Sequence, residues 1–116
     1  MGTKIVKNFV IRIFFANFAG KITNKMLRFI SFGSGSSGNS YYLYTETDSI
    51  LIDVGVGIRA LKKHFHNYGL RFEDVHHILI THDHADHVKS VGSLSTDYHL
   101  PVYATRKIHV GIERNY

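Results

Sequence analysis

The sequence predicts a mixed α/β fold in which helices cover a single sheet. Three observations predict it. Short runs of aromatic and β-branched residues are separated by polar and glycine-rich turns, which is typical of strands. The apolar residues of segment 58–68 recur at helical spacing. From Met26 onward the predicted order is β-β-β-α-β-α-β-α, so each helix is available to cover one face of the sheet.

The first three predicted elements are strands. Phe29–Phe32 and Tyr41–Thr45 are rich in aromatic and branched residues and flank the glycine-serine loop Gly33–Ser40. The polar turn Glu46–Ser49 then leads into a third strand, Ile50–Asp53.

The later part of the chain alternates helices and strands. A helix is predicted from Ile58 to Tyr68, and Gly69 provides its stop signal. The apolar run Val75–Thr81 suits a buried strand. A second helix, a short strand and a third helix follow over residues 88–98, 100–103 and 105–116.

Composition limits the possible functions. A chain of 116 residues makes one small domain, and the absence of cysteine excludes disulfides, thiolate metal sites and a cysteine nucleophile. The net charge of +5 lies in the five lysines and arginines of residues 1–25, since nine basic and nine acidic residues balance from Met26 onward. Net charge is therefore no argument for a nucleic-acid partner.

We expect two regions: an N-terminal extension over residues 1–25, disordered or upstream of the true start at Met26, and a domain over residues 26–116. The extension has a basic start and an apolar run, but Arg12 interrupts that run and no signal-peptidase site follows. The run is too short to span a bilayer, so we expect no stable membrane insertion. A surface-lying amphipathic helix is the alternative.

The loop "GSGSSGNS" has the glycine spacing of two phosphate-binding motifs but lacks the other features that each motif requires. A dinucleotide fingerprint needs a helix starting within the glycines, and a strand follows here. A P-loop needs a lysine where this loop has Asn39. Two roles stay open for the loop: a tight structural connection, or the lining of a substrate cleft.

The segment "THDHADH", residues 81–87, predicts a metal site. In an extended segment His82 and His84 would project the same way and bind one metal ion, while a following helix would direct Asp86 and His87 to a second. Imidazole and carboxylate groups are zinc ligands, and two adjacent metal ions can activate a bridging hydroxide.

The pattern H-x-H-x-D-H after a hydrophobic strand resembles the signature of the metallo-β-lactamase superfamily. The segments "FISFGSGSSGNSYYL", "LIDVG" and "ILITHDHADHVKSVGSL" look most like its small bacterial exonuclease-like branch, whose members are cytoplasmic and linked to cell-wall two-component systems. The resemblance implies a four-layer αβ/βα sandwich, of which residues 26–116 would form the N-terminal half. It also implies that a C-terminal half is needed to complete the site.

Position by position, the resemblance implies His82 and His84 as ligands of one metal ion and Asp86 and His87 as ligands of the second. Asp86 would also act catalytically by taking a proton from the attacking water. Asp53 would accept the other N–H of a ligand histidine. The expected cofactors are two divalent ions, most readily Zn²⁺, with Mn²⁺ or Fe²⁺ as alternatives.

Three functions follow as hypotheses. The first is a cytoplasmic metal-dependent phosphodiesterase, resembling a 5'-3' exonuclease, that acts on DNA or RNA in its full-length form and is inactive as this fragment. The second keeps the fold and changes the substrate to a small thioester, lactone, β-lactam or cyclic phosphate. The third is a non-catalytic metal-binding module.

Overall fold

The computed structural model describes residues 3–5 and 26–115 and confirms the mixed α/β class. Six strands form one sheet in the order β1-β6-β5-β4-β3-β2. The strands are β1 (Thr3–Ile5), β2 (Arg28–Gly33), β3 (Ser40–Tyr44), β4 (Ser49–Ile52), β5 (Ile78–Leu79) and β6 (Val102–Ala104). The helices are α2 (Ile58–Asn67), the 3₁₀ turn η1 (Phe72–Asp74), α3 (Ala85–Val88), α4 (Val91–Thr96) and α5 (Arg106–Asn115).

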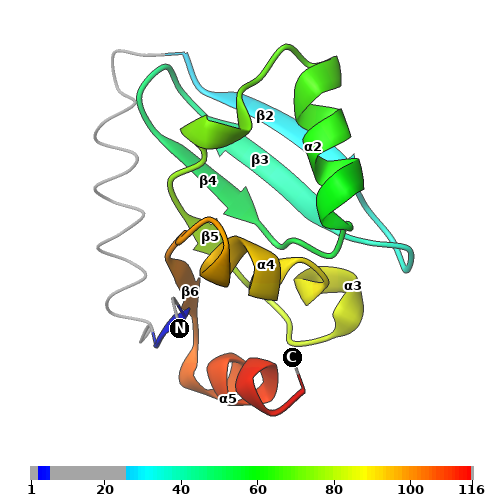
Figure 1. The fold of residues 1–116 in the computed structure, drawn as a ribbon, viewed down its shortest axis with the longest axis vertical. Coiled ribbons are helices and arrows are strands. Elements are labelled where there is room, and N and C mark those ends of the chain that lie inside the picture. The colour runs from blue at the N-terminus through cyan, green and yellow to red at the C-terminus, as the bar shows by residue number, and fades with distance from the viewer. Residues whose placement is uncertain (1–2, 6–25, 116) are drawn as a thin grey trace.

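The sheet has an antiparallel part and a parallel part. The β2–β3 and β3–β4 pairs are antiparallel, whereas β4, β5, β6 and β1 run parallel to one another. Parallel neighbours need crossover connections, and α2 and the α3–α4 pair are those connections. Because the carboxyl ends of parallel strands meet at one edge of a sheet, the loops after β4 and β5 lie together there (Figure 1).

The hydrophobic core lies between the sheet and the helices. Leu51, Ile78 and Val102 occupy one register across β4, β5 and β6, and all three are fully buried. Phe65 of α2 packs against Phe32 and against further aromatic rings of the sheet and η1. These contacts explain the predicted apolar stripe, since an amphipathic helix buries one face.

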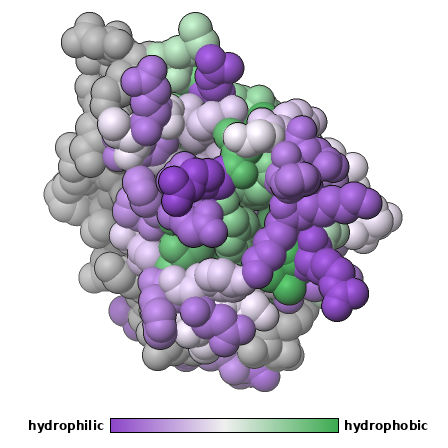
Figure 2. Space-filling view, turned by 45° about the horizontal axis from the view of Figure 1, so that its top comes forward, coloured by the Kyte–Doolittle hydropathy of each residue, from purple (hydrophilic) through white to green (hydrophobic). Residues whose placement is uncertain are grey.

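Figure 2 shows a largely hydrophilic face, with apolar areas visible between polar side chains near its centre and a paler apolar area at the top. A cavity of about 310 Å³ next to the β3–β4 turn is lined by Tyr44, Arg71 and Asp74, among others. None of its lining residues belongs to the histidine-rich segment. Within the described part of the chain, no helix is long and apolar enough to cross a membrane.

Two predicted elements differ from the structure. The strand predicted over Val75–Thr81 is reduced to Ile78–Leu79, with η1 before it. The helix predicted over 88–98 corresponds to α4, Val91–Thr96, and a separate short helix, α3, precedes it and ends at Val88. The two helices are separated at Ser90, whose backbone N–H donates to Val54 O and whose hydroxyl donates to Val56 O, so both bond the β4–α2 loop rather than the helix.

The N-terminal extension contributes three described residues. Thr3–Ile5 pair in parallel with Val102–Ala104 and form one edge of the sheet. The remainder of the predicted extension, residues 1–2 and 6–25, lies outside the described residues.

Candidate metal centre

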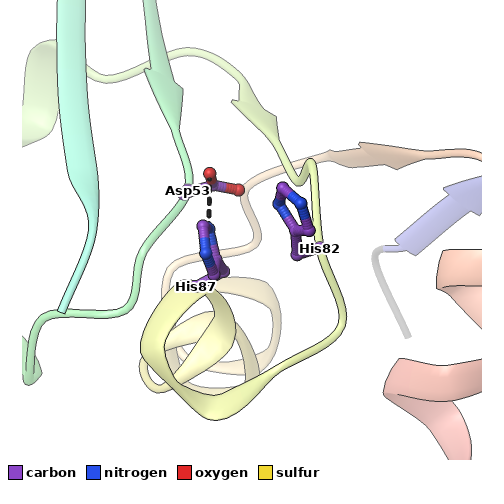
Figure 3. A group of neighbouring side chains, drawn as sticks. All are labelled: Asp53, His82 and His87. Atoms are coloured by element: carbon purple, nitrogen blue, oxygen red, sulfur yellow. Dashed lines mark hydrogen bonds and ion pairs between the residues drawn. The ribbon is translucent and has the colours of Figure 1, made fainter. Parts of the chain in front are cut away.

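The site forms where the chain leaves two neighbouring parallel strands. Asp53 follows β4, His82 lies in the loop after β5, and His87 lies on α3 (Figure 3). Each of the three side chains offers one ligand-type atom, and these atoms lie within 4.8 Å of one another. Residues far apart in the sequence therefore meet at the sheet edge where parallel α/β folds place their sites.

Asp53 is the buried centre of this arrangement. Its side chain is 4% exposed, and its Oδ2 lies 2.8 Å from His87 Nδ1. Its Oδ1 accepts from the Thr81 backbone N–H at 2.7 Å, and its Oδ2 accepts from the Thr81 hydroxyl at 2.6 Å. The residue has a φ of 62°, a left-handed conformation that aspartate tolerates better than most residues. Such a conformation persists where surrounding contacts hold it, and it is concentrated at functional sites.

These hydrogen bonds determine which nitrogen of each histidine is available. An Asp53 oxygen can only accept from His87 Nδ1, so Nδ1 carries the proton and Nε2 keeps its lone pair. The Thr81 hydroxyl donates its single proton to Asp53, so at 2.9 Å it accepts from His82 Nδ1. In the neutral imidazoles of both histidines Nε2 therefore keeps the lone pair, which makes it the atom available to a metal ion.

The same bonds argue for one of two roles of Asp53. By proximity, Asp53 could ligate a metal ion together with His82 and His87. Its two oxygens already accept three hydrogen bonds from Thr81 and His87, and its side chain is almost fully buried. We therefore favour an orienting role, in which Asp53 sets the tautomer of both imidazoles, directly for His87 and through Thr81 for His82.

Asp86 lies on the other side of His87. Its Oδ2 is 3.7 Å from His87 Nε2, and its side chain is 33% exposed. In the neutral imidazole this nitrogen keeps its lone pair, which faces the Asn39 amide at 3.5 Å, and a carboxylate oxygen beside such a nitrogen suits a shared divalent cation.

His84 lies apart from the other candidates. Its side chain is 76% exposed, and its ring centroid is 6.3 Å from that of His82. The rings of His82 and His87 are closer, at 4.4 Å. The binding of one metal ion by His82 and His84 stays a prediction: both residues lie beyond β5, which ends at Leu79.

Asp83 lies between the histidine loop and α5. Its side chain is 37% exposed. It occupies the space that a Cβ at Gly111 would need, so α5 packs directly against the histidine loop there.

Sequence reasoning missed two residues of the site, Thr81 and Asn39. In the sequence Thr81 was noted only as the last residue of an apolar run. Its position directly before His82 could have indicated a hydroxyl that bonds the site. Asn39 was noted only for the lysine it replaces in a P-loop pattern. The structure brings its side-chain amide against Asp86, 47 residues away.

We expect replacement of Thr81 by valine to weaken Zn²⁺ binding by about tenfold. Valine keeps the shape of the side chain but removes the hydroxyl that bonds both Asp53 and His82 Nδ1. Isothermal titration of the purified chain with Zn²⁺ measures the effect. Thr96→Val is the matched control, because the exposed Thr96 hydroxyl bonds only groups of its own helix end. Equal affinities for the two variants would contradict the orienting role of Thr81.

Comparison with known proteins gives one family and several relatives. Residues 28–115 match the family model described as anti-Pycsar protein Apyc1. The chain is 42% identical over 81 residues to a Bacillus anthracis protein named exodeoxyribonuclease YycJ, covering 70% of the chain and 31% of that protein. It is 38% identical over 82 residues to a Streptococcus pneumoniae protein named exodeoxyribonuclease WalJ, covering 71% and 30%. The chain thus spans about a third of the length of these relatives.

Solved structures show the same architecture. A mutant of a Cronobacter sakazakii metallo-β-lactamase with a HARLDQ motif superposes with a TM-score of 0.63 at 23% identity, over 72% of this chain and 34% of that one. The B3 metallo-β-lactamase BLEG-1 gives a TM-score of 0.56 at 28% identity, over 69% and 38%.

Proposed function

We propose, for a chain that belongs to the anti-Pycsar protein Apyc1 family and has the metallo-β-lactamase fold, that it supplies part of the metal centre of a phosphodiester hydrolase. The observation that carries the proposal is the pair of imidazoles whose Nδ1 atoms are hydrogen-bonded, so that Nε2 carries the lone pair, with the Asp86 carboxylate 3.7 Å from Nε2 of His87. Two relatives are named exodeoxyribonucleases, which supports DNA or RNA as the substrate class of the full-length protein.

The residues present fit a divalent metal ion. The imidazoles of His82 and His87 have ligand-type atoms within 4.8 Å of each other and of Asp53, and an Asp86 oxygen lies 3.7 Å from His87 Nε2. Zinc prefers such groups, and Mn²⁺ or Fe²⁺ also accepts them. His84, on the same loop, is exposed and available as a further ligand. Two divalent ions bound here would lower the pKa of a water ligand and so make hydroxide available near neutral pH.

The protein side chains would then have separate tasks. Four side chains would bind the metal ions: His82, His84, Asp86 and His87. Asp53 would keep His82 and His87 in the tautomer that has its lone pair on Nε2. The Asp86 carboxylate, whose side chain is partly exposed, would also accept the proton of the attacking water. Because the described residues offer few ligands for two metal ions, we expect full activity to require the remainder of a protein as long as the relatives.

The test combines metal retention with hydrolysis. After dialysis against Zn²⁺ and then buffer, we expect the purified chain to retain zinc, and His87→Ala to lose it. His66→Ala is the matched control, since His66 is an exposed histidine on α2, away from the site. Metal content is measured by atomic emission.

Hydrolysis is measured on linear double-stranded DNA, a p-nitrophenyl phosphodiester, a cyclic phosphate and a lactone. We expect the isolated chain to show no turnover and the full-length protein to cleave the phosphodiesters only when metal is present. Preferred cleavage of the lactone would favour the small-substrate alternative. Zinc retention that His87→Ala leaves unchanged, or activity that survives exhaustive chelation, would contradict the proposal.

A further inference from the structure

The side chain of Asn39 lies at the inner end of the glycine-serine loop, where it contacts the metal centre. The residue is 9% exposed and immediately precedes β3. Its Oδ1 accepts from the Gly35 backbone N–H at 3.0 Å. Its Nδ2 donates to Gly35 O at 2.8 Å and to Asp86 O at 3.0 Å, and lies 3.2 Å from Asp86 Oδ2.

These partners allow only one orientation of the amide. On the Nδ2 side, the Gly35 and Asp86 carbonyls and the Asp86 carboxylate are all acceptors, and on the Oδ1 side the Gly35 N–H is a donor. A flipped amide would set oxygen against three acceptors and leave a donor facing a donor. The loop therefore presents fixed N–H groups toward Asp86.

The contact is placed where it can set the direction of the Asp86 side chain. Asn39 Nδ2 carries two protons, so its 3.2 Å contact with Asp86 Oδ2 shares a proton with one of the shorter bonds to Gly35 O and Asp86 O. Among the described residues, it is the only side-chain donor recorded at this carboxylate. The same Nδ2 lies 3.5 Å from His87 Nε2, and Asp86 Oδ2 lies 3.7 Å from that nitrogen. One amide thus faces both members of the Asp86–His87 pair.

Main-chain bonds hold the segments together independently of the amide. Asn39 N–H donates to Asp86 O at 2.7 Å, and Gly55 N–H donates to Asn39 O at 2.9 Å. Any residue at position 39 other than proline keeps these bonds. A side-chain substitution therefore tests the amide rather than the attachment of the loop.

We propose that Asn39 is a positioning residue that holds the Asp86 carboxylate beside His87 Nε2, in the arrangement needed to bind a divalent cation. The role in cation binding rests on the proposed function, whereas the hold on Asp86 does not. The glycine-serine loop then has a defined task. It brings the Asn39 amide to the Asp86–His87 pair at the edge of the sheet.

The test uses Asn39→Ala and Asn39→Asp, with Asn67→Asp as matched control because Asn67 is exposed at the end of α2. Alanine removes the amide. Aspartate replaces the amide donor with a carboxylate oxygen, which cannot donate a hydrogen bond to Asp86. We expect both variants to bind Zn²⁺ about 10- to 100-fold more weakly than the parent chain, and Asn67→Asp to bind it equally well. Zn²⁺ affinity is measured by isothermal titration, and thermal unfolding without metal checks that each variant is folded.

A double-mutant cycle separates positioning from general structural support. In an Asp86→Ala background, Asn39→Ala should change Zn²⁺ affinity by less than about twofold, because the group on which it acts is gone. If the double variant instead loses Zn²⁺ affinity by the product of the two single-variant losses, the proposal is overturned. It is also overturned if Asn39→Ala alone keeps an affinity within about twofold of the parent chain.

A metal-free measurement keeps the two proposals distinguishable. In the NMR spectrum of the apo chain, the Asn39 side-chain amide protons should exchange slowly with water and shift on Asp86→Ala. If those resonances do not respond, the positioning role is refuted whatever the metal data show. If they respond but the parent chain binds no Zn²⁺, the hold on Asp86 is supported and the proposed function fails.

Discussion

Replacing Gly55 by alanine is expected to disrupt both the fold and the metal centre. A Cβ at position 55 would coincide with the backbone carbonyl of Asp86 and crowd the His87 backbone nitrogen. These atoms belong to the turn into α3, which is fixed by bonds from Asn39 N–H to Asp86 O and from Val54 N–H to His87 O. Backbone atoms cannot rotate away as a side chain would, so we expect a loss of about 3 kcal/mol or more in the free energy of unfolding.

The matched control for this prediction is Gly57→Ala. Its Cβ would have only the Lys89 side chain within contact distance, at 3.9 Å, and its φ of −58° suits any residue. Urea unfolding followed by circular dichroism gives both free energies. Gly55→Ala should also abolish Zn²⁺ retention, because it displaces Asp86 and His87 together. A stability loss no larger than that of Gly57→Ala would mean that the close approach of the two segments is not required.

Asp53→Ala is the second change with a large expected effect. It leaves the Thr81 N–H, the Thr81 hydroxyl and His87 Nδ1 without their common acceptor in a buried site. Each buried donor left without its acceptor costs about 1–3 kcal/mol. Alanine is also less suited than aspartate to the φ of 62°. We expect the variant to unfold at markedly lower urea concentration than the parent chain, and Asp97→Ala, at an exposed helix end, to match the parent.

Asp53→Asn separates the stability effect from the effect on metal binding. Asparagine keeps the size of the side chain and accepts a positive φ. Its amide N–H cannot accept from His87 Nδ1, so the histidine would change tautomer and lose Nε2 as a ligand atom. We expect a folded protein whose Zn²⁺ affinity is lower by about 10- to 100-fold. Unchanged affinity in this variant would indicate that Asp53 supports the fold only.

The elements could be predicted because their signals are local. The boundaries of β2, β3, β4 and α2 agree with the predicted ranges to within one residue, since alternation and helical spacing follow from covalent geometry. The resemblance to the metallo-β-lactamase superfamily is confirmed, including its exonuclease-like branch, because the motif segments that carry it are contiguous in the sequence. The break between α3 and α4 was not predictable, since Ser90 is bonded by residues 34 and more positions away.

The sequence by itself determined which side chains are available to a metal ion, because five candidate groups follow two apolar runs and their chemistry is fixed by residue type. Only the tertiary structure decided how they are grouped. It brings Asp53 and His82 together with His87, leaves His84 exposed, and adds Thr81 and Asn39. The reason is physical: these contacts join the ends and loops of neighbouring strands, antiparallel for β3–β4 and parallel for β4–β5, and strand order brings together residues that no local pattern relates.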